Sequence, residues 1–198
     1  SLMTTTYEPN KVLSNQTFKV VGTRPIRHDG ADKVTGRAKY GADYTATGLL
    51  HGKTLRSPHA HARIKSIDTS KAEALPGVKA VVTSKDFPPA KDTADFGLGG
   101  QPMDRFRGNL LAGDKALYRG HAIAAVAATS PHIAEEAIGL IEVDYEVLPA
   151  VLTAPEGMAA DAPILIADLT TQEFGKDTGR TSNIADHFQH KMGDLDKG

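Results

Sequence analysis

The sequence predicts an α+β fold in which two strand–helix–strand units lie on a mixed sheet with long loops. Short runs of alternating apolar residues flank a capped helical stretch twice, at 60–87 and at 121–148. Chain breakers are frequent, with 19 Gly and 11 Pro among 198 residues, which indicates many turns. Hydrophobic residues make up 40% of the chain and charged residues 24%, so a packed core is expected.

The N-terminal part of the chain predicts little regular structure. Residues 1–19 are polar and aperiodic, which indicates a flexible arm, and Ser1 and Leu2 before Met3 resemble a cloning remnant. In the next stretch, VVGTRPIRHDGADKVTGRAKYGADY (20–44), glycines separate short segments. This pattern is typical of extended chain with tight turns.

Two strands are expected next. Gly48 introduces GLLHGKTLRS, and Pro58 then marks a strand edge or bulge because proline cannot donate a ladder hydrogen bond. The stretch AHARIKSID (60–68) alternates small or apolar residues with His61, Arg63 and Lys65. That alternation predicts a half-buried strand whose polar face carries the imidazole.

A helix follows a strand in each unit. The first helix is expected between capping residues at 68–70 and the Pro76–Gly77 stop, before the strand VKAVVTSKDF. In the second unit, HAIAAVAATS is a strand of small residues, Ser130 is a good N-cap and Pro131 suits the first helical position. One apolar stripe then predicts the helix, formed by Ile133, Ala134, Ala137, Ile138 and Ile141.

The remaining segments give weaker signals. IEVDYEVL (141–148) alternates, with Val143, Tyr145 and Val147 inward, and Pro149 ends it. Residues 88–110 contain three prolines and GLGG without periodicity, which predicts a long loop. Residues 150–198 are rich in Ala, Pro and Asp and stop in MGDLDKG without a finishing element, so we expect the sequence to be cut there.

Two histidines suggest a metal or ligand site. His59 and His61 would project from one face if both lie on a strand, because side chains at i and i+2 point the same way. A metal ion requires a third ligand, and His51 is the nearest candidate. The alternative is a polar strand edge whose imidazoles bind backbone groups or a neighbouring domain.

Other possible sites have structural explanations. GLGG at 97–100 lacks the strand and the Lys-Ser/Thr of a phosphate loop. Glu135, Glu136, Glu142, Asp144 and Glu146 lie opposite apolar stripes, as on solvated faces, and Arg105 and Arg107 around Phe106 are too few for a nucleic-acid surface. The sequence therefore predicts no catalytic, cofactor-binding or metal-binding residue in this chain.

Composition excludes several classes of protein. Net charge is −1, so no bulk charge indicates nucleic acid or membrane as a partner. The absence of cysteine excludes disulfides and an iron–sulfur cluster held by this chain. No run of about 18 apolar residues and no signal peptide occur, so a cytoplasmic location is expected.

Four stretches, in order, resemble one family of enzymes. They are 20–44, LRSPHAHARIKSIDTSKAEALPGVKAVVTSKDFP (55–88), LLAGDKALYRGHAIAAVAATSPHIAEEAIGLIEVDYEVLPAV (110–151) and the terminal Gly-Asp at 193–194. They are similar to the N-terminal α/β-hammerhead domain of the molybdenum hydroxylase large subunit, in the xanthine dehydrogenase and aldehyde oxidase family. LRSPHAHARI, VDYEVLPAV and the VVGTR opening look most like the bacterial 4-hydroxybenzoyl-CoA reductase and carbon monoxide dehydrogenase type.

The resemblance implies a structural domain that is inactive alone. It implies a flexible arm over 1–19, a hammerhead domain over 20–152, and an extended linker over 153–198 that leads to missing molybdopterin-binding domains. Molybdopterin and the catalytic glutamate would lie in those domains, and iron–sulfur and FAD groups on partner subunits. The enzyme would oxidise or hydroxylate aldehydes, purines or aromatic and heteroaromatic compounds. The alternatives are a stand-alone metal- or ligand-binding module using His51, His59 and His61, and a free-standing scaffold.

The chain departs from the family's pattern in one place. After Gly120 the family often has Gln-Pro or Asp-Pro, whereas this chain has His121–Ala122, and the frequent KVRY is KALY at 115–118. If this turn approaches a cofactor or a neighbouring domain, the substitution changes the contact and weakens any assignment of substrate.

Overall fold

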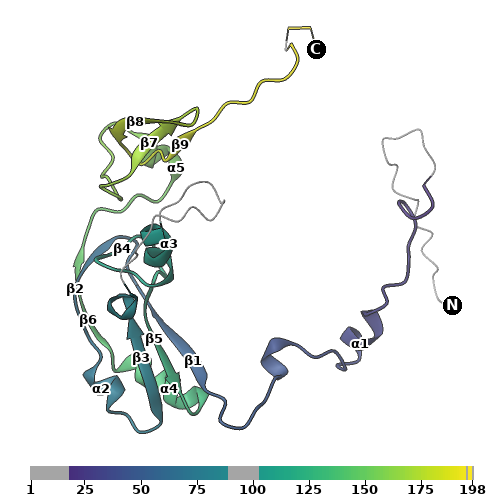
Figure 1. Ribbon diagram of the computed structural model, residues 1–198, viewed down its shortest axis with the longest axis vertical. Coiled ribbons are helices and arrows are strands. Elements are labelled where there is room, and N and C mark those ends of the chain that lie inside the picture. Colours follow the sequence, from purple (N-terminus) through teal and green to yellow (C-terminus); the bar gives the residue numbers. More distant parts are fainter. Residues whose placement is uncertain (1–17, 89–102, 195, 198) are drawn as a thin grey trace, which may run out of the picture. The chain divides into compact units, whose positions relative to one another are not determined.

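The computed structural model describes residues 18–88, 103–194, 196 and 197 (Figure 1). The chain divides into two units between residues 47 and 48. The first contains α1 (Gly30–Val34) and the 3-10 turn η1 (Gly41–Asp43). The second contains β1 (His51–Arg56), β2 (Ala62–Asp68), α2 (Ser70–Glu73), β3 (Val78–Thr83), η2 (Ser84–Asp86), α3 (Met103–Leu110), β4 (Lys115–Ala116), β5 (Ala122–Ala128), α4 (Pro131–Gly139), β6 (Glu142–Val147), α5 (Ala154–Met158), β7 (Thr170–Glu173), β8 (Lys176–Thr181) and β9 (Asp186–His187).

The first unit has local structure without a core. None of the described residues 18–47 is buried. Asp29 precedes α1 and accepts ion pairs from Arg27 at 2.5 Å and from Lys33 at 2.8 Å. These partners hold the pKa of the Asp29 carboxyl below its usual value. Most of the arm expected at 1–19 lies outside the described residues.

Two three-stranded sheets form the body of the second unit. One has the order β1-β5-β3 and the other β4-β2-β6, and every neighbouring pair in them is antiparallel. Both strand–helix–strand units occur as predicted. Each unit, however, divides its two strands between the sheets, so that β2 and β3, and likewise β5 and β6, are not in one sheet (Figure 1). The single mixed sheet of the prediction is therefore wrong in this detail, although the α+β class is confirmed.

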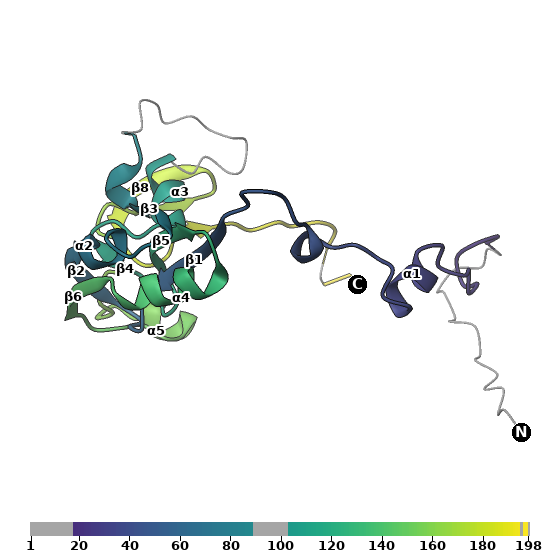
Figure 2. The ribbon, with the colours of Figure 1, turned by 90° about the horizontal axis from the view of Figure 1, so that it is seen from below.

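An alanine-rich strand makes the centre of the core. β5 lies between β1 and β3. Three of its alanine and valine side chains, Ala124, Val126 and Ala128, are at most 2% exposed, and the helix α4 packs over them (Figure 2). Small side chains let the helix approach the sheet closely. Ser130 caps α4 as predicted, since its hydroxyl accepts the N–H of Ile133 at 3.2 Å. The predicted stripe is confirmed, with Ala134 and Ala137 fully buried and Ile141 7% exposed.

A second apolar cluster lies against the other sheet. It contains Ala112, Ala116 and Ile123, all fully buried, and shares Leu55, Ile67 and Val143 with the first cluster. The strand pairing of β2 with β6 shifts between Ile64 and Ser66, so Ile64 and Ile67 both face the core. At the end of β6, Val147 is 64% exposed, which corrects the prediction that it points inward.

The described part of 88–110 is not entirely a loop. Residues 103–110 form α3, and the following Leu111 is only 6% exposed. Burial of this apolar side chain at the end of α3 stabilises a short helix that its residues' helix propensity alone would not. The GLGG stretch at 97–100 lies outside the described residues.

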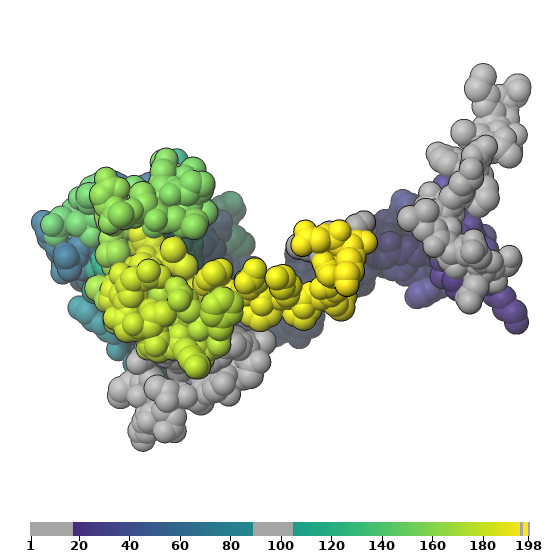
Figure 3. All heavy atoms as spheres, turned by 90° about the horizontal axis from the view of Figure 1, so that it is seen from above, coloured from purple at the N-terminus to yellow at the C-terminus, as the bar shows by residue number. Residues whose placement is uncertain are grey.

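The segment expected to be a linker, 153–198, has secondary structure of its own. Thr153 caps α5, and β7 pairs with β8 antiparallel and with β9 in parallel, giving a third sheet of order β8-β7-β9. Its one fully buried side chain among the described residues is polar, Thr171. Figure 3 shows this segment in yellow-green at the surface. No helix in the described part of the chain is both long and apolar enough to cross a membrane.

Candidate functional site at the histidine-bearing turns

The three histidines of the alternative metal-binding hypothesis do not meet. His51 is the first residue of β1, whereas His59 and His61 follow the last residue of that strand. The five steps between the six residues of β1, at about 3.3 Å each, separate its two ends by roughly 17 Å. Among the described residues, no group of three His, Cys, Asp or Glu side chains could hold a metal ion.

His59 and His61 also do not share a strand face. The strand β2 begins at Ala62, and both histidines lie in the turn before it. His61 is 5% exposed, which corrects its predicted place on a polar face. The i and i+2 argument failed because it requires extended backbone, and Pro58 begins a turn instead.

His61 binds the end of β6. Its Nδ1 lies 2.7 Å from the carbonyl oxygen of Pro149, and because a carbonyl only accepts, Nδ1 carries the proton. The His61 carbonyl accepts the N–H of Leu148 at 3.0 Å. The other ring nitrogen, Nε2, is buried and has no hydrogen-bond partner. His61 therefore fixes where the chain leaves β6.

Ser57 connects the neighbouring turns. Its hydroxyl donates to the His59 carbonyl at 3.0 Å, and the hydroxyl oxygen accepts the His59 N–H at 3.1 Å. Its N–H donates to the His121 carbonyl and its carbonyl accepts the Gly120 N–H, both at 2.8 Å. The ring of His59 packs edge-on against Tyr145 at 5.0 Å, and burial raises the pKa of the Tyr145 phenol despite a hydrogen bond with Ser57.

His121 is held by both ring nitrogens. Nδ1 accepts the N–H of Leu117 at 3.2 Å, and Nε2 donates to the Gly108 carbonyl on α3 at 2.8 Å. The ring is 1% exposed and stacks on Tyr118 at 4.4 Å. Burial lowers the pKa of His121, and the bond to Gly108 opposes this in part. Sequence reasoning noticed the departure at this position but did not identify the contacts, which join residues distant along the chain.

The acidic rows are solvated faces, as predicted. Across the two strands, Glu146 pairs with Arg63 at 3.2 Å and Asp144 with Lys65 at 3.9 Å, while Glu142 pairs with Lys71 of α2. On α4, Glu135 pairs with Lys53 at 2.5 Å. All of these side chains are at least 44% exposed, so none has the buried, differing environment of a general acid and base.

The basic residues of α3 also act within the fold. Arg105 donates to the Asp168 carbonyl at 3.4 Å, and Arg107 lies over the ring of Phe87 at 5.7 Å. Both arginines therefore contact other parts of the same chain.

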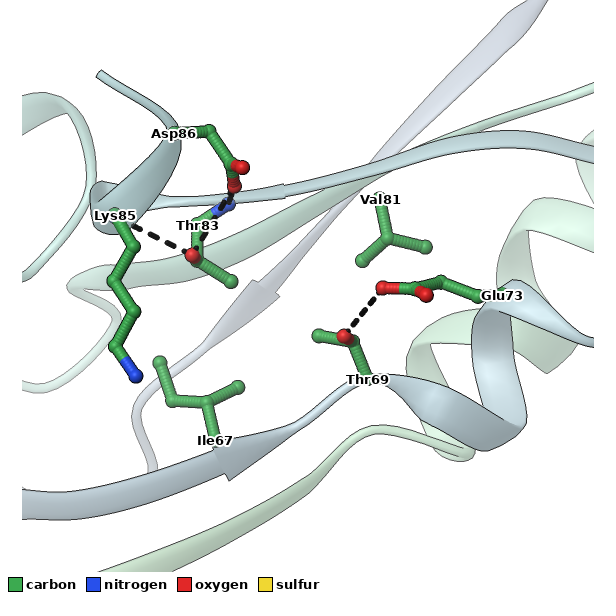
Figure 4. Close-up of a pocket in the computed structure, with 7 residues that line it drawn as sticks. All are labelled: Ile67, Thr69, Glu73, Val81, Thr83, Lys85 and Asp86. Carbon is green, nitrogen blue, oxygen red and sulfur yellow. Dashed lines mark hydrogen bonds between the residues drawn. The ribbon is translucent and has the colours of Figure 1, made fainter. Parts of the chain in front are cut away.

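One cleft opens between the two sheets. It has a volume of about 260 Å³ and is lined by Ile67, Thr69, Glu73, Val81, Thr83, Lys85 and Asp86. Figure 4 shows the Glu73 carboxylate turned to Thr69, whose hydroxyl donates to it at 2.6 Å. Asp86 accepts the Thr83 N–H at 2.7 Å, as a cap of η2. Both acids in the cleft are therefore bound to the chain itself.

Comparison with known proteins agrees with the resemblance. The family model described as "Aldehyde oxidase and xanthine dehydrogenase, a/b hammerhead domain" matches residues 35–149. The carbon monoxide dehydrogenase large chain of Afipia carboxidovorans is 37% identical over 194 residues, 96% of this chain and 23% of that one. The xanthine dehydrogenase molybdenum-binding subunit of Escherichia coli is 35% identical over 174 residues, 84% of this chain and 23% of that one.

Solved structures are similar over the same part. Reconstituted CO dehydrogenase from Oligotropha carboxidovorans superposes with a TM-score of 0.59 and 41% identity, covering 70% of this chain and 16% of that one. Aldehyde oxidoreductase from Desulfovibrio gigas gives 0.58 and 33%, covering 72% and 16%. The chain thus spans about a quarter or less of the length of these relatives.

Proposed function

Because the chain belongs to the aldehyde oxidase and xanthine dehydrogenase family, through the a/b hammerhead domain, we propose that it is the N-terminal structural domain of a molybdopterin-binding subunit. The whole enzyme would oxidise or hydroxylate aldehydes, purines or aromatic and heteroaromatic compounds, and this domain would be inactive alone. Relatives named as a carbon monoxide dehydrogenase large chain and as a xanthine dehydrogenase molybdenum-binding subunit support this proposal.

One observation carries the structural role. The buried histidines bind the chain's own backbone, His61 through Nδ1 to Pro149 and His121 through both ring nitrogens to Leu117 and Gly108. Groups used in this way position turns and do not react with a substrate. The domain would therefore supply a rigid shape against which other domains pack.

Neither of two hollows in the described part of the chain supports a molybdenum cofactor site. A phosphate-bearing pterin requires free arginines or backbone N–H groups that face it. The charged side chains that line the cleft between the sheets are two carboxylates, Glu73 and Asp86, and one lysine, Lys85, so its net charge does not favour phosphate. A second hollow, of about 370 Å³ between α5 and β8, has one arginine, Arg180, and Glu173 already pairs with it at 3.3 Å.

The cofactors and partners follow as proposals. Molybdopterin would lie in domains C-terminal to this one, with residues 20–152 as the hammerhead and 153–198 leading toward those domains. Iron–sulfur and flavin groups would lie on partner subunits, with which the assembled subunit works in the cytoplasm. No nucleic acid or membrane would take part.

The purified 198-residue chain tests the proposal. We expect a folded protein that contains no molybdenum by elemental analysis and oxidises neither benzaldehyde nor xanthine with a dye as electron acceptor. The full-length subunit, produced with its partner subunits, is the positive control for both measurements. Stoichiometric molybdenum in the 198-residue chain, or turnover by it, would contradict the proposal.

A stand-alone metal-binding module is the second candidate. The observation in its favour is His61, whose Nδ1–H is fixed by a carbonyl and whose Nε2 has no partner, as in many metal-binding histidines. Calorimetric titration with zinc decides between the two functions. We expect no tight binding; one-to-one binding that His59→Ala and His61→Ala each abolish, in variants with an unchanged circular dichroism spectrum, would favour the module.

A further inference from the structure

His121 joins three segments that are distant along the chain. Its ring binds the turn at Leu117 and the helix α3 at Gly108, and its carbonyl accepts the N–H of Ser57. The helix is also held by the burial of Leu111 and by the bond from the Ala112 N–H to the Ala122 carbonyl at 2.8 Å. Its two arginines contact other parts of the chain, Arg105 the Asp168 carbonyl and Arg107 the Phe87 ring. The imidazole is therefore a principal side-chain contact between α3 and the 117–120 turn.

The contacts are compatible with one protonation state. Because the Leu117 N–H can only donate, Nδ1 must be unprotonated, and because the Gly108 carbonyl can only accept, Nε2 must carry the proton. A second proton would go to Nδ1, where it would face the Leu117 N–H. An acceptor would then become a donor opposed to another donor, in a ring that is 1% exposed.

The surroundings do not stabilise a cationic ring. The charged groups on the elements packed around it include Arg56, which donates to the Gly120 carbonyl at 2.9 Å, Arg119 in the same turn, and Arg105 and Arg107 on α3. Asp114 and Lys115 precede the 117–120 turn, and the Asp104 side chain of α3 lies outside those described. Tyr118 is the titratable group that stacks on the ring. No carboxylate among the described side chains is bonded to His121.

We propose that His121 is an acid-sensitive latch, whose neutral ring holds α3 to the 117–120 turn and whose protonation releases both while the alanine-rich core stays folded. The released helix includes Phe106 and Leu110, which are 54% and 52% exposed at i and i+4 on its outer face. The latch thus determines whether this apolar pair is held in a fixed position.

The direction of the pH effect follows from linkage. Burial lowers the pKa of His121 below its ordinary value of 6.5, so between these two values the released state binds a proton that the latched state does not. The latch is at full strength above about pH 6.5. It weakens as the pH falls below that value.

Amide hydrogen exchange of the 198-residue chain, followed by NMR, tests the latch. Protection factors, which correct for the intrinsic pH dependence of exchange, are compared at pH 7.5 and pH 5. We expect those of Leu111 and Leu117 to fall at pH 5, by at most about 30-fold, the limit that an ordinary histidine pKa of 6.5 sets at that pH. Those of Val126 in β5 and Ala134 in α4 should stay constant, and the His121 ring resonances should titrate below 6.5.

Two variants complete the experiment. In His121→Asn the side-chain oxygen can replace Nδ1 as the acceptor but does not titrate, so the protection of Leu117 should no longer change with pH. His132→Asn removes an exposed histidine of α4 and should leave the wild-type response intact. Loss of protection at all four amides together, or constant protection while the His121 ring titrates, would overturn the proposal without requiring either variant to fold.

Discussion

The hammerhead body, residues 48–152, and the segment at 153–187 are stabilised by different interactions. The body buries contiguous apolar side chains, mainly the alanines of β5 and α4. The segment has no such cluster among the described residues, and hydrogen bonds from Thr171, Asn183 and their neighbours connect its strands. Two long side chains of the body, Arg105 and Lys115, donate to carbonyls of this segment, the second at 2.8 Å to Leu165.

This difference affects cooperativity. Apolar burial is shared among many neighbours, so the loss of one contact weakens the whole cluster. Hydrogen bonds between side chain and backbone act locally, and their net contribution is about 1 kcal/mol each. We therefore expect the body to unfold as one unit and the segment to open separately, at lower free energy.

The substitution Gly77→Ala should produce the largest effect, in the body. Gly77 has a φ of +95°, and a Cβ there would lie 2.6 Å from Cδ1 of Ile133 and 2.9 Å from Oγ1 of Thr129. Backbone strain and overpacking each cost about 1–3 kcal/mol. We expect the free energy of global unfolding in urea to fall by about 3 kcal/mol.

A matched glycine serves as the control. Gly120→Ala introduces a similar positive φ, +89°, with open space around the added carbon, and should cost about 1 kcal/mol. Equal losses for the two variants would show that the close packing of α4 on the β2–α2–β3 connection has no energetic weight. That result would contradict the view that close apolar packing stabilises the body.

The sequence predicted the elements of the apolar body better than those of the hydrogen-bonded segment. Helix α4, strand β5 and the cap at Ser130 were predictable because burial of one face leaves a periodic pattern of apolar residues along the chain. Thr171, Ser182 and Asn183 leave no such pattern, since each binds a partner specified by loop geometry. The third sheet was therefore predicted as a linker region, and the division of each unit between two sheets was not predicted, because alternation does not identify a strand's neighbour.

Asn183→Ala should give the second largest effect, confined to the segment. The Asn183 side chain accepts the Leu165 N–H at 3.0 Å and donates to the carbonyls of Gly157 and Pro163 at 3.2 and 3.0 Å. Loss of these bonds should cost about 2 kcal/mol of local stability. Hydrogen exchange measured by mass spectrometry should show faster exchange over 157–187 and unchanged exchange in β5. Faster exchange in both regions would indicate a single cooperative unit and contradict the comparison.

The candidate site was predictable only in part. The sequence correctly singled out the turn at 57–61 and the unusual His121 as places to examine. The roles of these residues depend on contacts such as His61 with Pro149, which are 88 residues apart, and on which nitrogen of each ring binds. The spacing of residues along the chain specifies neither these long-range contacts nor the ring nitrogen that binds. The metal-binding and structural hypotheses therefore could not be separated before the turn at Pro58 was known.

The smallest predicted effect comes from one chemical change made in both regions. Ser130 in the body and Ser182 in the segment each place a hydroxyl within hydrogen-bond distance of a fixed partner, the Ile133 N–H at 3.2 Å and Thr171 Oγ1 at 2.7 Å. Replacement by alanine should cost about 1 kcal/mol in each case.

Ser130→Ala should lower the urea midpoint of global unfolding, because α4 covers the shared core. Ser182→Ala should leave that midpoint unchanged and speed exchange only at amides of the third sheet, such as Gln172, whose N–H donates to the Ala185 carbonyl at 2.9 Å. If both variants shift the global midpoint equally, the hydrogen-bonded segment is part of the same cooperative unit as the apolar body, and the difference in chemistry does not produce a difference in stability.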